Sequence, residues 1–203
     1  MNVKQILFNT EMVRAILDGR KTCTRRVIKP QPYGKCTYPL GFVTDSTEKK
    51  EVGCFGFGVD ECGGSIQYAK PSYQPGDILY VRETWKNAPN GYYYYEDWQK
   101  NDIADVTKWK PSIHMPKEAA RIWLKVTNVR VERLQEITTN QIEQEGVETE
   151  YPHVLNGEEK KYAFQNLWNS TIKKSDLDRY GWDANPYVWV IEFERCEKPG
   201  SEV

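Results

Sequence analysis

The chain has 203 residues, of which 39% are hydrophobic and 13% aromatic. This is enough apolar material to form a core, so wholesale disorder is excluded. The mean hydropathy is −0.74, and no apolar run approaches the roughly 18 residues of a membrane span. We therefore predict a cytoplasmic protein without a membrane partner. At about 150 residues per domain, the length predicts a single domain over residues 1–203.

The charge is unevenly distributed along the chain. The net charge is −1, but residues 1–40 carry eight basic groups against two acidic ones, a local charge of +6. A basic cluster on a nearly neutral protein suits a confined anionic partner, such as a nucleotide or a short stretch of RNA. The alternative is a solvated face whose charges pair with one another.

The cysteine pattern argues against both disulfides and zinc. There are five cysteines, namely Cys23, Cys36, Cys54, Cys62 and Cys196. An odd count with loose spacing is not typical of a disulfide framework. The short Cys-x(2–4)-Cys step of structural zinc sites is also missing. We expect reduced thiols, no metal and no other cofactor.

The first 27 residues predict a strand, a helix and an extended segment. Residues 5–8 form the strand, and Asn9 or Thr10 caps the helix that follows. Gly19 supplies the left-handed residue that ends the helix. Residues 21–27 then turn into an extended segment.

The rest of the chain predicts further strands separated by irregular segments. Residues 29–75 are rich in Pro and Gly and indicate an irregular excursion or a β-ribbon. After a Pro-Gly-Asp turn, residues 78–85 form a strand. Residues 121–131 alternate between apolar and polar side chains, with a bulge expected at Asn128. Residues 187–194 form the last strand.

Two helices are predicted in the last third of the chain. The spacing Thr138–Gln141 matches a capping box, which opens a short helix that ends at Gly146. Residues 160–172 place their apolar side chains on one helical face. Separate strands with short helices predict an α+β, mainly β fold: a small β-barrel decorated with two or three helices. Residues 29–75 and 86–118 would be insertions.

The first candidate site is the segment Gly19–Arg26. A turn at Lys21 can bring its amine beside Thr24, and neighbouring arginines disfavour the ammonium form, which should lower the pKa of Lys21. A neutral lysine beside a hydroxyl activates an oxygen nucleophile, as in Ser–Lys enzymes. The alternative is that Arg25 and Arg26 contact phosphates while Thr24 only completes a turn.

Three further residues are candidates for a site. Glu145 lies in the last turn of its predicted helix, where the macrodipole disfavours an anion by about 0.3–1 kcal/mol. Such a carboxylate is either kept for function or tolerated because it is exposed. Glu83 and Trp85 share a face of their predicted strand. They form a pocket wall, or Glu83 pairs with the basic N-terminal segment.

Several short motifs resemble a known family. Gly19-x-Lys21-Thr22-x-Thr24-x-Arg26, the Gly76-Asp77 turn and the terminal Val190-Ile191-Glu192-Phe193 resemble the ASCH-domain family, whose PUA-like β-barrel is associated with RNA binding. Gly19-Arg20-Lys21-Thr22, with Leu134-x-x-Ile137-Thr138 and Glu143-Gln144-Glu145, is similar to the small bacterial N4-acetylcytidine amidohydrolases. The segments Arg25–Pro30 and Val81–Trp85 resemble longer relatives from bacteriophage and prophage genomes.

The resemblance implies a site and a reaction. The implied catalytic residues are Lys21, Thr24 and Glu145. From the residues themselves, we predict Arg25, Arg26, Glu83 and Trp85 as substrate-binding residues. Together they would hydrolyse the amide at an acylated exocyclic amine of a cytidine, in a free nucleoside or in RNA. Thr24 would attack the acyl carbon or, equally, orient a water. The competing functions are a non-catalytic, phage-encoded RNA-binding module and a nuclease or other RNA-processing activity.

Overall fold

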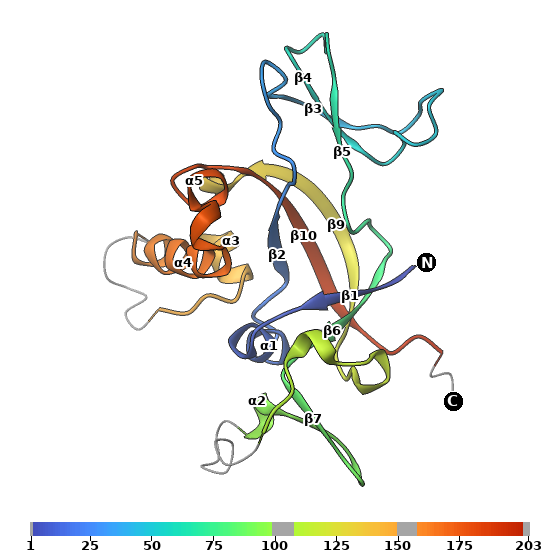
Figure 1. The fold of residues 1–203 in the computed structure, drawn as a ribbon, viewed down its shortest axis with the longest axis vertical. Coiled ribbons are helices and arrows are strands. Elements are labelled where there is room, and N and C mark those ends of the chain that lie inside the picture. The colour runs from blue at the N-terminus through green and yellow to red at the C-terminus, as the bar shows by residue number, and fades with distance from the viewer. Residues whose placement is uncertain (1, 99–107, 150–157, 201–203) are drawn as a thin grey trace.

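A strongly curved five-stranded sheet forms the centre of the molecule (Figure 1). The computed structural model describes residues 2–98, 108–149 and 158–200. The strands of the sheet, in their spatial order, are β1 (Val3–Leu7), β6 (Ile78–Arg82), β9 (Trp123–Arg133), β10 (Tyr187–Cys196) and β2 (Cys23–Val27). β1 and β6 are parallel, and the other neighbours are antiparallel. The α+β class predicted from the sequence is confirmed, but the predicted β-barrel is not closed, because β1 and β2 are the edges of the sheet and do not pair with each other.

A β-bulge interrupts the two longest strands of this sheet. Glu192 of β10 pairs with Asn128 of β9, whereas the next residue, Phe193, pairs with Val126, so Thr127 has no partner. An extra residue of this kind bends a strand and increases its twist. The bulge predicted at Asn128 is therefore confirmed. Strands β9 and β10 arch across the molecule (Figure 1).

Both faces of β10 are buried, against different partners. Trp189, Ile191 and Phe193 point into the main core on the side of helix α1 (Thr10–Leu17). Val188 and Val190 point to the opposite face and pack in a second cluster with residues of helices α3 (Thr139–Gln144) and α4 (Glu158–Thr171). Because side chains alternate along a strand, this one strand joins the two helical layers.

The helix ends follow local sequence rules. The Asn9 side chain accepts a hydrogen bond from the Met12 amide, and Gly19 ends α1 with a φ of 76°. The predicted capping box of Thr138 and Gln141 is present at the start of α3. Within the described ranges, no helix combines the length and the apolar character that a bilayer crossing requires.

Residues between 29 and 75 form a β-ribbon that packs on the main sheet. Its strands are β3 (Tyr38–Phe42), β4 (Phe55–Gly58) and β5 (Gln67–Ala69), paired in that order and drawn at the top of Figure 1. The ring of Phe57 lies 4.9 Å from that of Tyr187, and the ring of Phe55 lies 6.3 Å from that of Trp189. These ring contacts anchor the ribbon to β10.

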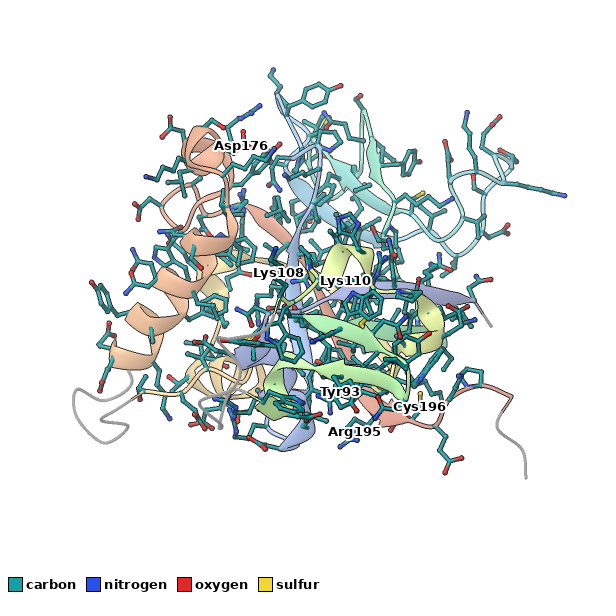
Figure 2. The ribbon with its side chains drawn as sticks, turned by 60° about the horizontal axis from the view of Figure 1, so that its bottom comes forward. Tyr93, Lys108, Lys110, Asp176, Arg195 and Cys196 are labelled. Carbon is teal, nitrogen blue, oxygen red and sulfur yellow. The ribbon has the colours of Figure 1, made fainter. Side chains whose placement is uncertain are left out.

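The strand predicted over residues 78–85 is confirmed for Ile78–Arg82 (β6) but ends three residues early, because the chain leaves the sheet after Arg82. The Glu83 amide donates to Met115 Sδ at 3.2 Å, and Trp85 starts a separate hairpin. The hairpin comes forward in Figure 2, where Tyr93 is labelled and Lys110 lies on the returning segment that bridges to Trp85.

The remaining elements are a hairpin and several short helical turns. The hairpin consists of β7 (Trp85–Ala88) and β8 (Gly91–Tyr94), and two further α-helical turns are α2 (Tyr95–Trp98) and α5 (Leu177–Tyr180). The 3₁₀ turns are Ser112–His114, Lys117–Ala119, Leu134–Glu136 and Lys174–Asp176.

Gly146 and Gly19 offer a matched pair of substitutions. Their φ angles are 78° and 76°, but a Cβ on Gly146 would lie 2.6 Å from Ala15 Cβ, whereas Gly19 has no atom within 4 Å of that position. We expect Gly19→Ala to lose about 1 kcal/mol of stability from backbone strain alone. Gly146→Ala should lose about 2 kcal/mol more from the steric clash. Urea unfolding of both variants measures the difference, and equal losses would contradict the close packing of Gly146.

Candidate functional site

The Lys21 side chain is buried and completely engaged. The turn after α1 is fixed on both sides, since the Lys21 amide donates to Ala15 O and the Thr22 amide donates to Gln144 O. Lys21 Nζ donates to Cys23 O at 2.7 Å, to Glu145 O at 2.8 Å and to Glu145 Oε2 at 2.8 Å. Three acceptors match the three protons of an ammonium group.

Two opposing effects act on the pKa of Lys21. Burial disfavours the charged form and lowers the pKa, while the Glu145 carboxylate raises it, and burial dominates. The predicted direction of the shift is therefore confirmed. The predicted cause is only partly right, because desolvation outweighs the repulsion from Arg26.

Glu145 is the buried carboxylate around which the cations gather. It follows α3 as its C-cap and is 5% exposed. One carboxylate oxygen accepts from Lys21 Nζ, and the other accepts from Arg25 Nη1 at 3.1 Å. Of the two interpretations of Glu145 from the sequence, exposure is wrong. The unfavourable position at the helix end is offset by two cations.

The ion pairs continue across the sheet. Arg25 also donates to Glu132 at 2.9 Å, and Glu132 accepts from Arg130, which in turn pairs with Glu192. Burial opposes the charge on Glu132, but the bonds from Arg130 and Arg25 prevail and lower the pKa of this carboxyl. The register places Arg25 beside Val190 and Val190 beside Arg130, so these side chains share one face.

Thr24 and Arg26 point to the other face of β2. The Thr24 side chain is buried, and its hydroxyl accepts a hydrogen bond from Arg26 Nη1 at 3.0 Å. Arg26 Nη2 donates to Leu7 O of β1 at 3.1 Å. β1 and β2 are the two edges of the sheet, so the Arg26 side chain bridges its open seam. The ring of Phe8 lies beneath both Arg26 and Lys21, with centroid distances of 5.4 and 5.5 Å.

A cavity of about 140 Å³ brings the predicted catalytic residues together beside this seam. Its polar wall contains Lys21, Thr24, Arg25, Arg26 and Glu145. Its apolar wall comes from the end of β1, from α1 and from α4, with Leu7, Phe8, Met12, Phe164, Leu167 and Trp168. Among the described residues, no hydrogen bond joins Lys21 Nζ to the Thr24 hydroxyl. The predicted contact between them is replaced by the ion pair of Lys21 with Glu145.

A cysteine beside the cavity is a poor nucleophile. Cys23 is buried next to Lys21, and burial raises the pKa of its thiol to about 12. Thiolate is the reactive form, so almost none is present at neutral pH. Across the described part of the chain, no three His, Cys, Asp or Glu side chains lie close enough to hold a metal ion.

Glu83 and Trp85 do not line this cavity, so their assignment to its wall needs correction. Both Glu83 oxygens bind Arg121, at 3.0 and 2.9 Å, and Arg121 also pairs with Asp97. Burial raises the pKa of Glu83, opposed by the bonds from Arg121. Trp85 packs with Met115 and neighbours in a third apolar cluster. The expected ion pair of Glu83 with the N-terminal basic segment is replaced by Arg121.

Two parts of the site could not be predicted from the sequence. Phe8 and Met12 carried no chemical signal, because a single aromatic or apolar residue there is equally typical of a core. Glu132 lies on a strand, where the alternation of side chains indicates a face but not its ionic partner. The apolar face of the predicted second helix was recognised, and Phe164 and Trp168 on that face cover the cavity.

Comparison with known proteins returns two solved structures. One is an ASCH domain from Lactobacillus crispatus JV V101, with 10% identity and a TM-score of 0.38 over 96% of this chain and 79% of that one. The other is a hypothetical protein, PH0355, with 14% identity and a TM-score of 0.37 over 97% of this chain and all of that one. The sequence matches no protein-family model and no curated protein.

Glu145 and Glu143 allow a controlled test of the buried ion pairs. Glu145→Gln removes a charge that compensates Lys21 and Arg25, and should reduce the free energy of unfolding by about 3 kcal/mol. Glu143→Gln, on the same helix, affects only an exposed pair with Lys160 and should cost less than about 0.5 kcal/mol. Urea unfolding at neutral pH measures both. Equal effects would show that Glu145 is not compensated as described.

Proposed function

We propose that the cavity hydrolyses the amide between an acyl group and the exocyclic amine of a modified cytidine, with N4-acetylcytidine as the reference substrate. The observation that carries the proposal is the convergence of three groups on one small cavity: a buried hydroxyl, a buried lysine and a buried carboxylate. The motif around Lys21 and Thr24, which resembles the small bacterial N4-acetylcytidine amidohydrolases, supports the choice of substrate.

Thr24 is the proposed nucleophile. Its hydroxyl accepts a hydrogen bond from the Arg26 guanidinium, which favours a developing negative charge on that oxygen. Attack on the acyl carbon forms a new C–O bond, and the C–N bond to the exocyclic amine then breaks. Water hydrolyses the resulting ester to release acetate and restore Thr24. If Thr24 instead orients a water, the same products form without the ester.

Lys21 and Glu145 are the proposed proton carriers. The 2.8 Å bond between Lys21 Nζ and Glu145 Oε2 allows a proton to pass between them. Once Lys21 has released a proton to solvent, Nζ turns from its backbone acceptors, its lone pair accepts the Thr24 proton, and this proton passes on to Glu145. Glu145 then protonates the leaving amine. Arg25 holds the second oxygen of Glu145 at 3.1 Å and so keeps this carboxyl oriented.

The first test compares two threonines two residues apart. Purified protein is incubated with N4-acetylcytidine, and cytidine and acetate are separated by chromatography. Thr24→Val should lower kcat at least about 100-fold, because it removes the nucleophile with little change in volume. Thr22→Val is the control, since Thr22 is exposed and lies outside the cavity.

The results of this assay distinguish an enzyme from a non-catalytic RNA-binding module. Turnover that is lost in Thr24→Val and in Lys21→Met but kept in Thr22→Val supports the proposal. Absence of turnover at high enzyme concentration, together with salt-dependent binding of RNA, would instead favour the non-catalytic RNA-binding alternative.

The pH profile tests the role of Lys21. Burial lowers its pKa below the ordinary value of 10.5, so the neutral fraction grows as the pH rises through the lowered pKa. If neutral Lys21 is the base, kcat should increase with pH and then level off, with the same profile in Thr22→Val. A rate that falls as the pH rises from neutral would contradict a basic role for Lys21.

A further inference from the structure

A second cavity lies next to the first and shares the Arg26 side chain with it. It measures about 310 Å³, and Arg26 lines both cavities. The residues around it come from β2 and the segment that follows, from residues 70–73 and from the core face of β9 and β10. Tyr73, which lines it, donates its hydroxyl hydrogen to Gln5 O of β1 at 2.8 Å. The second cavity therefore lies along the same seam, between the strand edges β1 and β2.

The residues that line the second cavity carry positive charge and include no acidic side chain. Three cationic side chains line it, Arg26, Lys29 and Lys70, and no carboxylate does. Within the described ranges, none of the three lies within salt-bridge distance of an acidic side chain. Arg26 is half-buried, and its hydrogen bonds go only to neutral oxygens, those of Thr24, Arg25 and Leu7. Burial lowers the pKa of its guanidinium, and this effect outweighs the coulombic attraction of the Glu145 carboxylate, which raises it.

A third cavity borders the cavity that contains Lys21, Thr24 and Glu145 (the proposed catalytic cavity), and its lining has a different charge pattern. The cavity that shares Met12 and Leu167 with it is lined by Arg14 and Arg20, but also by Glu11 and Glu148. Its charges balance, whereas those of the second cavity do not. An anionic group attached to a substrate in the catalytic cavity is therefore favoured on the Arg26 side only.

The small volume of the proposed catalytic cavity also favours a ligand that extends beyond it. Typical ligand pockets measure about 300–1,000 Å³, so the catalytic cavity of about 140 Å³ holds only part of a nucleoside. The rest of the ligand must lie outside it. The second cavity offers an apolar wall that includes Trp189, and the Ser72 hydroxyl, which makes no hydrogen bond within the described part of the chain, is a free donor.

From this arrangement we infer that the second cavity binds the phosphate of a phosphorylated cytidine, so that the substrate is a nucleotide or an RNA residue. The inference deepens the proposed function and rests on it for the identity of the base. Arg26 and the two lysines donate charge-assisted hydrogen bonds to phosphate oxygens. The Lys29 ammonium lies 4.5 Å from the centre of the Tyr180 ring and, within the described residues, forms no ion pair.

Binding of unacylated ligands tests the inference without requiring turnover. Calorimetry at low salt compares cytidine, cytidine 5′-monophosphate and a cytidine-centred trinucleotide without terminal phosphates. The monophosphate or the trinucleotide should bind at least about tenfold more tightly than cytidine, and added salt should reduce the advantage. An advantage of the monophosphate alone identifies a nucleotide, and an advantage of the trinucleotide identifies an RNA phosphodiester.

Lysine variants provide the control. The double variant Lys29→Gln/Lys70→Gln should abolish the phosphate advantage, whereas Lys35→Gln, exposed and outside the cavity, should retain it. The inference is overturned if neither phosphorylated ligand binds more tightly than cytidine, or if the advantage survives in the double variant. Failure of N4-acetylcytidine turnover would contradict the proposed reaction without altering these binding results.

Discussion

The buried carboxylate of Glu145 connects most of the elements around the candidate site. Its two oxygens bind Lys21, from the turn after α1, and Arg25, from β2. A charge transferred from water into a protein interior is expensive unless it is paired and fully hydrogen-bonded. Each of the three groups therefore requires the others. The end of α3 is held against both the edge of the sheet and α1, and the tight packing of Gly146 against Ala15 has the same effect.

An open seam between two sheet edges determines where the cavities lie. Unpaired strand edges are normally covered or charged, because they can pair with other chains. Here the Arg26 side chain crosses from β2 to the Leu7 carbonyl of β1 and replaces backbone pairing with a single bridge. A side chain fills less of the gap than a strand would. Two cavities remain next to the bridge: β2 lines the first with Thr24, Arg25 and Arg26, and the second with Arg26 and Val27.

The sequence predicted those parts of the fold that depend on neighbouring residues. The cap at Asn9, the box at Thr138 and the left-handed Gly19 and Gly146 are local devices, and each is present. Lys21 and Thr24 were identified because they lie three residues apart in one motif. The partners of Glu83 and Glu145 could not be derived in this way. Glu83 binds Arg121, and Glu145 binds residues more than a hundred positions away, so both contacts depend on the tertiary fold.

Compensated and uncompensated charges divide the site into two regions with different physical roles. On one face of β2, positive and negative groups alternate from Lys21 through Glu145, Arg25 and Glu132 to Arg130. Such a network fixes geometry, because moving any member leaves a buried charge unpaired. On the other face, Arg26 has only neutral acceptors. A cation that forms no ion pair in a partly buried cavity gains most from a ligand that supplies an anion. Folding requirements therefore explain the paired charges of the first region, and the proposed phosphate site would explain the second.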